Sequence, residues 1–168
     1  MSATELVADL ATKARTAART LSTATGAERK AALEAIAQAI ESRSAEILAA
    51  NEADMVSARA ENMHPQMQDR LLLTAERIKA IASGARQVAA LPDPLGQILR
   101  KSTLPNGLEL EQISVPFGVI GMVYVARPNV TVDAAVILLM SGNAALLRGS
   151  STARNSNEIL VNVMKEAL

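Results

Sequence analysis

The feature that most constrains this 168-residue sequence is a change of hydrophobic period at the start of its last third. Residues 117–125 are almost wholly apolar and rich in β-branched side chains, which is typical of a strand buried on both faces of a parallel sheet. Pro128 suits the first turn of a helix over 130–140, and residues 144–148 form a second short apolar run before a final helix over 153–168. Because parallel strands need a crossover between them, this order predicts a βαβα unit.

The chain before this unit has helical spacing instead. Apolar residues recur three and four positions apart over residues 4–21 and 27–50, with a break predicted in the second stretch. Asn51 is predicted to cap a further short helix to about residue 60, and Thr74 a helix to about residue 90. We therefore expect an N-terminal helical part over residues 1–96.

A hairpin is predicted between the helical part and the βαβα unit. Residues 97–104 and 108–115 are extended, partly alternating runs, and Pro105-Asn106-Gly107 joins them. An Asn-Gly pair between strand-like segments is a strong hairpin signal. The predicted fold is thus α/β: helices over 1–96, a peripheral hairpin over 97–115, and a βαβα unit over 116–168. Two strands leave open sheet edges, so the sheet is expected to be incomplete.

Charge and composition exclude several classes of partner. The 17 basic and 17 acidic residues balance, so the chain has no strong field that would draw it to nucleic acid or to a membrane surface. No apolar stretch reaches the roughly 18 residues of a membrane helix, and the first residues lack a basic segment followed by an apolar block. The expected location is therefore the cytoplasm. The absence of cysteine excludes a sulfur nucleophile within this chain, and no metal-binding cluster is seen.

Two loops could carry chemistry, because ligands bind beyond the carboxyl ends of parallel strands. The first, residues 126–129, combines the cation of Arg127 and the carboxamide of Asn129 with a helix start whose amides are free to face an anion. The alternative is that Asn129 and Thr131 only satisfy local backbone groups while Arg127 is solvated.

The second loop, residues 148–152, offers the guanidinium of Arg148, a glycine, and the hydroxyls of Ser150 and Ser151 at another helix start. Phosphate is a natural ligand for such groups. The alternative is a helix cap beside a surface arginine. Neither of the glycine-rich nucleotide fingerprints is present.

Several runs of the sequence resemble one enzyme family. These are residues 115–121 (VPFGVIG), 126–133 (ARPNVTVD), 141–143 (SGN) and 147–149 (LRG), with 69–74 (DRLLLT), 91–94 (LPDP) and 105–107 (PNG) upstream. Together they resemble the γ-glutamyl phosphate reductases, also called glutamate-5-semialdehyde dehydrogenases, of the aldehyde dehydrogenase superfamily. The resemblance covers nearly the whole chain and identifies it with the amino-terminal portion of that family.

The resemblance implies an activity and an architecture. The family uses NADPH to reduce γ-glutamyl phosphate to glutamate 5-semialdehyde in proline biosynthesis. A cysteine thiolate displaces phosphate, the resulting thioester accepts hydride, and the hemithioacetal collapses to the aldehyde. The fold implied is a Rossmann-like NADP-binding domain, a separate catalytic domain and an oligomerisation ribbon, which would correspond here to residues 97–115.

The resemblance also implies roles for individual residues. Asn129 matches the carboxamide that donates to the developing oxyanion and is the expected catalytic residue. Arg127 is assigned to the acyl phosphate or the substrate carboxylate on chemical grounds alone. The expected cofactor-binding residues, which favour NADP(H) over NAD through a 2′-phosphate, are Val125, Ala126, Arg148, Ser150 and Ser151. Asn129 and Arg148 are expected to project into one crevice.

The chain departs from the family in length. The family's chain is more than twice as long, and its remaining part carries the catalytic cysteine, the other sheet strands and the catalytic domain. We therefore expect this chain to be a fragment, from truncation, proteolysis or a split gene, and to be inactive alone. The full enzyme is expected to form homo-oligomers and to act with glutamate 5-kinase. The alternative is a non-catalytic nucleotide-binding or oligomeric interaction module.

Overall fold

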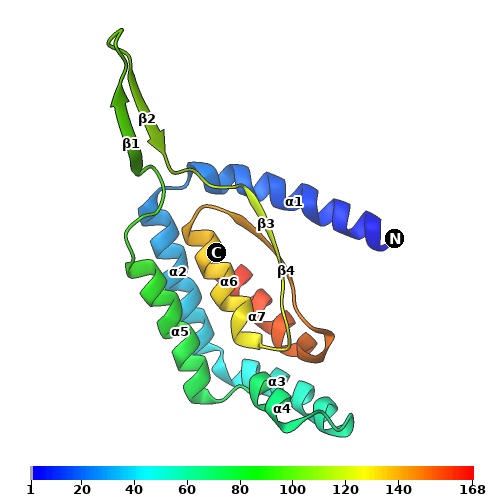
Figure 1. Cartoon of the computed structure of the whole chain (residues 1–168). Helices are drawn as coiled ribbons and strands as arrows, with labels where there is room; N and C mark the ends of the chain where they lie inside the picture. Colours follow the sequence, from blue (N-terminus) through cyan, green and yellow to red (C-terminus); the bar gives the residue numbers. More distant parts are fainter. Residues whose placement is uncertain (1) are drawn as a thin grey trace.

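A computed structural model describes residues 2–168 of the chain. Its first half is helical, with α1 (Ala3–Thr23), α2 (Gly26–Ser42), α3 (Ser44–Ala60), α4 (Pro65–Leu71) and α5 (Ala75–Ala90). The second half contains β1 (Ile98–Thr103), β2 (Glu109–Ile113), β3 (Val119–Val123), α6 (Pro128–Met140), β4 (Ala144–Arg148), a 3₁₀ turn, η1 (Ser151–Ala153), and α7 (Arg154–Ala167). This order confirms the predicted fold class of helices, a hairpin and a parallel βαβα unit (Figure 1).

The main apolar core lies between four helices, α2, α5, α6 and α7. Its most buried side chains are aliphatic and at most 1% exposed; they include Leu33, Ile40, Ile78, Val132 and Leu160. α6 is apolar around most of its circumference because it packs on this helical layer and also contacts β4. The other side of the small sheet contacts α1, through Ala14, Ala18 and Ala144.

Two helix starts follow residues that the sequence analysis named. The Thr74 hydroxyl accepts the backbone N–H of Arg77 at 3.2 Å and starts α5, and Pro128 occupies the first turn of α6. The break predicted in the second helical stretch falls at Arg43, between α2 and α3. A capping hydroxyl thus marks the start of α5 and a first-turn proline that of α6, whereas α3 begins without a side-chain cap.

Two helix predictions need correction. The prediction that Asn51 caps a short helix is wrong: Asn51 lies inside α3 and is 1% exposed, because its side chain bonds to the backbone of a distant segment. α4 was not predicted at all. Its seven residues are too few to show a helical period, although His64 and Pro65 form its N-cap and first turn.

The carboxyl ends of β3 and β4 are neighbours, as predicted. The strands pair in parallel, from Val119 with Ala144 to Val123 with Arg148. Beyond the last pair, the Tyr124 backbone N–H donates to the Arg148 carbonyl at 3.1 Å. The loops that follow the two strands therefore start side by side.

The prediction that residues 117–125 form a strand buried on both faces is wrong. β3 covers only 119–123, and Phe117 is 92%, Val123 74% and Val125 56% exposed. Within residues 2–168, β3 pairs with β4 alone and forms an edge. An apolar sequence forms a buried strand only where other elements cover both of its faces. Here α1 and α6 contact β4 more extensively than they contact β3, so β3 is left partly exposed.

The turn at Ser141-Gly142-Asn143 joins the starts of the two strands. The Asn143 side chain accepts the Gly118 backbone N–H at 2.8 Å and donates to the Ser141 carbonyl at 3.0 Å. Gly142 has a φ of 72°, and a Cβ there would lie 2.8 Å from the Leu95 side chain. This motif is therefore structural, and its glycine is required by both conformation and space.

The hairpin of β1 and β2 projects away from the helical body (Figure 1). The segment leading into it is held by Arg29, which is 4% exposed and binds both carboxylate oxygens of Asp93 at 2.6 and 2.7 Å. Arg29 also donates to the Met140 carbonyl at 3.1 Å, at the end of α6. The Leu95 backbone N–H and the Arg29 guanidinium hold the pKa of Asp93 below its usual value. Within residues 2–168, no helix is long and apolar enough to cross a membrane.

Gly142→Ala should destabilise the chain by about 1–3 kcal/mol, because alanine is strained at positive φ and its methyl group meets Leu95. Gly84→Ala is the matched control: Gly84 lies inside α5 with no atom near the added Cβ, so this change should stabilise the helix by about 0.5–1 kcal/mol. Urea unfolding of both variants measures the difference. Equal unfolding midpoints would contradict the structural role of Gly142.

Candidate functional site

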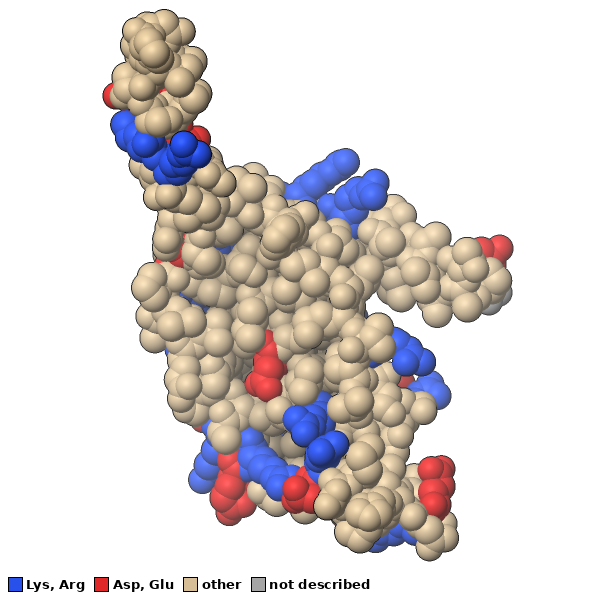
Figure 2. Space-filling view, viewed as in Figure 1, with Lys and Arg blue, Asp and Glu red and all other residues tan. Residues whose placement is uncertain are grey.

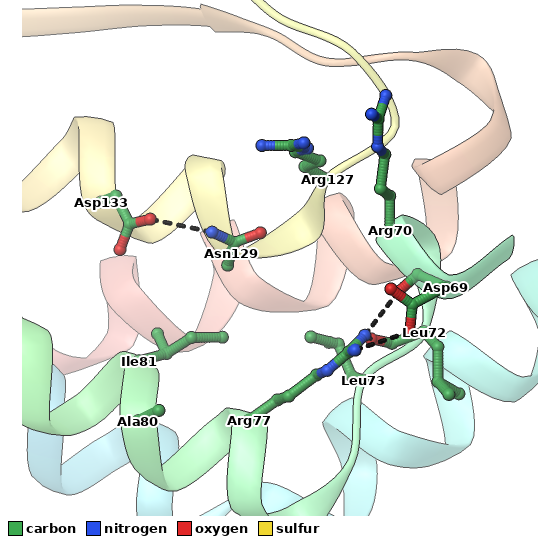
Figure 3. Close-up of a pocket in the computed structure, with 10 residues that line it drawn as sticks. All are labelled: Asp69, Arg70, Leu72, Leu73, Arg77, Ala80, Ile81, Arg127, Asn129 and Asp133. Atoms are coloured by element: carbon green, nitrogen blue, oxygen red, sulfur yellow. Dashed lines mark hydrogen bonds and ion pairs between the residues drawn. The ribbon is translucent and has the colours of Figure 1, made fainter. Parts of the chain in front are cut away.

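A cavity of about 400 Å³ opens beside the start of α6, between the loop that follows β3 and the α4–α5 region. Three arginines, two aspartates and one asparagine give it a polar wall (Figure 3). The lining residues are Asp69, Arg70, Leu72, Leu73, Arg77, Ala80, Ile81, Arg127, Asn129 and Asp133. The volume suits a small polar ligand.

Asn129 and Asp133 lie one turn apart on α6 and interact in the cavity wall. The Asn129 Nδ2 donates to Asp133 Oδ2 at 3.0 Å (Figure 3). This bond uses one of the two Nδ2 hydrogens and fixes the orientation of the carboxamide, which leaves the second hydrogen for another acceptor. Burial raises the pKa of Asp133, and the hydrogen bond from Asn129 offsets part of that rise.

The guanidinium of Arg77, one of the three arginines, is hydrogen-bonded to nearby groups of the same chain. It donates to the Leu72 carbonyl at 2.8 Å and to Asp69 Oδ1 at 2.7 Å, and also to the Asp69 backbone carbonyl. Arg77 thus neutralises Asp69 and clamps the end of α4 to the start of α5. Its role in the cavity is structural.

Arg70 and Arg127 carry charge that no carboxylate of residues 2–168 neutralises through an ion pair. Both are exposed, and the close-up draws both on the side of the cavity away from α5 (Figure 3). On the visible face, basic and acidic side chains gather at the lower end of the molecule, where α3 and α4 lie (Figure 2). The cavity therefore has an excess of positive charge and favours an anionic ligand.

A buried polar network holds the α4–α5 segment in place. Asn51 Oδ1 accepts the Leu73 backbone N–H at 2.7 Å, and Asn51 Nδ2 donates to the Leu71 carbonyl at 2.9 Å and to Ser156 Oγ at 3.0 Å. Beside it, the carboxylate of Asp54 accepts the backbone N–H of Ser156 at 2.8 Å and its hydroxyl at 2.6 Å. The network joins α3 to the segment after α4 and to the start of α7.

The first loop brings the predicted residues Arg127 and Asn129 into this cavity. Sequence reasoning missed Arg70 and Asp69 as companions of these two residues, and it expected Asp133 to hold a backbone amide near the start of α6, whereas Asp133 accepts the side chain of Asn129. The run at 69–74 was noted only as part of a family resemblance, and no local pattern shows that it folds onto the start of α6.

The second loop lies outside this cavity, so the structure does not bring Arg148 into one crevice with Asn129. Arg148 is exposed at the end of β4, and Ser151 is exposed in η1. The Ser150 hydroxyl accepts the Thr152 backbone N–H at 3.3 Å and also bonds to the Thr152 hydroxyl, as the helix-cap alternative expects.

The two remaining cofactor candidates precede the first loop. Val125 is exposed, whereas Ala126 is 4% exposed and belongs to a small apolar cluster with Met55, Leu71 and Ala153. The side chain of Ala126 therefore has a packing role, and only its backbone is left to border a ligand.

The fold and the site define this chain as part of an α/β protein with a polar site at the carboxyl end of a parallel strand. No protein-family model matches the sequence. The γ-glutamyl phosphate reductases of Geobacillus thermodenitrificans and Geobacillus kaustophilus are 56% and 53% identical over 158 residues, and that of Kineococcus radiotolerans is 51% identical over 164. The chain belongs to the γ-glutamyl phosphate reductase family and matches an N-terminal portion of it.

These matches cover nearly all of this chain but a much smaller share of each relative. The matches span 94–98% of this chain but only 38% of the length of the curated relatives. The crystal structure of γ-glutamyl phosphate reductase from Thermotoga maritima superposes with a TM-score of 0.92 at 39% identity, over 94% of this chain and 38% of that one. The structure from Saccharomyces cerevisiae gives 0.90 at 27% identity, over 99% and 42%.

Asp133→Asn should change how stability depends on pH. The carboxyl of Asp133 is half-buried, and its raised pKa means that the folded state disfavours its charged form. The resulting loss of stability is absent below the unfolded pKa of about 3.9 and complete above the raised folded pKa. Asparagine has no such penalty. Urea unfolding at several pH values should therefore show the variant gaining stability relative to the wild type as pH rises through this window. An unchanged difference would contradict the burial effect.

Proposed function

We propose that this chain provides the N-terminal portion of a cytoplasmic enzyme that uses NADPH to reduce γ-glutamyl phosphate to glutamate 5-semialdehyde in proline biosynthesis. The observation that carries the proposal is the positively charged cavity that contains Arg127 and Asn129, in a chain 56% identical to a γ-glutamyl phosphate reductase. In this proposal residues 1–96 and 116–168 belong to a Rossmann-like cofactor domain, and the catalytic domain lies outside this sequence.

Asn129 is the proposed catalytic residue. An amide N–H aimed at a carbonyl oxygen stabilises the negative charge that develops when a nucleophile adds to the carbonyl. The bond to Asp133 supports this role, because it orients the carboxamide and leaves one Nδ2 hydrogen free of that partner. Asp133 then acts as a positioning residue.

Arg127 is proposed to bind an anionic group of the substrate, which carries an acyl phosphate at one end and a carboxylate at the other. Its position two residues before Asn129 and its lack of an ion-pair partner within residues 2–168 support this role. A guanidinium binds either group through charge-assisted hydrogen bonds.

Arg148 and Ser151 fit the 2′-phosphate of NADPH, because both are exposed and Arg148 makes no ion pair within the described residues. Ser150 fits less well, since its hydroxyl already caps η1. The backbone at Val125 and Ala126 is proposed to border the cofactor. NADPH, when bound, supplies the hydride for the reduction.

The chain contains no cysteine, so we propose that it does not turn over alone. The proposed enzyme is a homo-oligomer that receives γ-glutamyl phosphate from glutamate 5-kinase. Assembly through the hairpin at residues 97–115 is supported by its exposed aliphatic side chains, among them Ile98, Leu99 and Ile113. The same surface favours the second candidate function, an oligomeric interaction module without catalysis.

The test of the proposed function is a hybrid of the Geobacillus thermodenitrificans relative in which this chain replaces the 158 matched residues. We expect the hybrid to form NADPH from glutamate 5-semialdehyde, phosphate and NADP⁺, which is the reverse of the proposed reaction. Asn129→Ala should lower its kcat by about 100–1000-fold, because an oxyanion donor is lost.

The control for this variant is Asn62→Gly, at an exposed turn with a φ of 53° that glycine accepts. It should leave the rate unchanged. An inactive hybrid would contradict the proposed function, and an Asn129→Ala rate close to that of the parent hybrid would remove Asn129 from catalysis.

Arg148→Ala in the same hybrid and the same assay should raise the KM for NADP⁺ by about tenfold and leave the KM for NAD⁺ unchanged, because only NADP⁺ carries the 2′-phosphate. Steady-state rates with each cofactor measure this. Arg100→Ala, an exposed arginine of β1, is the matched control. Equal effects on both cofactors would exclude a phosphate contact by Arg148.

A further inference from the structure

Arg70 is a second uncompensated arginine of the cavity, and none of the roles above includes it. It lies at the end of α4, one residue after Asp69. Asp69 is paired with Arg77, so it does not neutralise Arg70. The only hydrogen bond that the Arg70 side chain makes within the described residues is weak, at 3.9 Å from its Nη1 to the sulfur of Met67. Its guanidinium is available to a ligand.

Arg70 and Arg127 reach the cavity from different elements. Arg127 and Asn129 belong to the loop after β3 and the first turn of α6, whereas Arg70 comes from α4. Both arginines line one cavity of about 400 Å³, which has room for a small ligand with an anionic group at each end. γ-Glutamyl phosphate has this form, since its α-carboxylate and acyl phosphate lie at opposite ends of a short chain.

The position of Arg70 is defined by buried contacts although its side chain is exposed. Directly after it, Leu71 is 0% exposed, and the carbonyl of Leu71 and N–H of Leu73 both bond to the buried Asn51. The segment is clamped on its other side by Arg77. Arg70 is thus presented from a fixed backbone, which is what recognition of one end of a ligand requires.

We infer that Arg70 binds the α-carboxylate of the substrate and so selects amino-acid substrates, while Arg127 and Asn129 face the reacting γ-end. This inference rests on the proposed function for the identity of the substrate. Arg70 is a specificity residue in this arrangement: it anchors the end of the molecule where no bond changes, and it thereby places the γ-carbonyl at Asn129.

The test uses two probes that differ only in the α-carboxylate. L-Glutamate carries the α-carboxylate, and 4-aminobutyrate is the same molecule without it. Calorimetric titration of this chain should give tighter binding of L-glutamate than of 4-aminobutyrate, by about tenfold. Arg70→Ala should remove that preference by weakening L-glutamate alone. Arg100→Ala, on the exposed hairpin, should keep the preference.

Four results would overturn the inference. The wild-type chain could bind both probes equally or fail to bind L-glutamate, Arg70→Ala could retain the preference, or it could weaken both probes alike, which would put Arg70 at the γ-end. Thermal melting of the variant checks that it is folded, as expected for a change at an exposed side chain. These outcomes are distinct from failure of the proposed function, which shows as an inactive hybrid enzyme whatever this chain binds.

Discussion

The site depends on the buried polar network of Asn51 and Asp54. Both side chains are nearly inaccessible, at 1% and 3% exposure, and each satisfies backbone groups of a distant segment. Asn51 holds the chain just after α4, and Asp54 holds the first turn of α7. Unpaired buried polar groups cost about 1–3 kcal/mol each, so the two segments are fixed to α3 in one arrangement. The arginine at the end of α4 therefore meets the start of α6 at a defined place.

This arrangement separates two tasks at the carboxyl ends of β3 and β4. The loop after β3 lines, together with residues of α4 and α5, an open cavity that has excess positive charge and contains Asn129. The loop after β4 stays at the surface, where Arg148 is exposed beside the start of α7. In the proposed enzyme the first loop faces the substrate and the second faces the cofactor. Parallel pairing places the two loops side by side while their functional side chains enter different surroundings.

Much of the fold could be predicted from the sequence because its signals are local. Pro105-Asn106-Gly107 indicates the hairpin, Thr74 and Pro128 mark helix starts, and the apolar run at 144–148 coincides with β4. The role of Asn51 could not be predicted in this way, because its partners are two backbone groups about twenty residues away and the still more distant hydroxyl of Ser156. The exposure of Phe117 and Val125 was also missed, since an apolar pattern does not reveal which neighbours cover a strand.

The same distinction between local and distant signals explains what could be predicted of the site. Arg127 and Asn129 stand next to a predicted strand end, and this placed them among the candidates before the cavity was known. Arg70 is about sixty positions away in the sequence, and no periodicity connects it to them. Its proximity to them depends on α4, a helix too short to show a period, and on the contacts of α3 with α7. Only the three-dimensional structure brings these side chains to one cavity.

The most direct test of the account is a crystal structure of the hybrid enzyme with L-glutamate bound. The account predicts electron density for glutamate in the cavity, with its α-carboxylate at Arg70 and its γ-carboxylate toward Arg127 and Asn129. Glutamate bound in the reverse orientation, or outside this cavity, would contradict it.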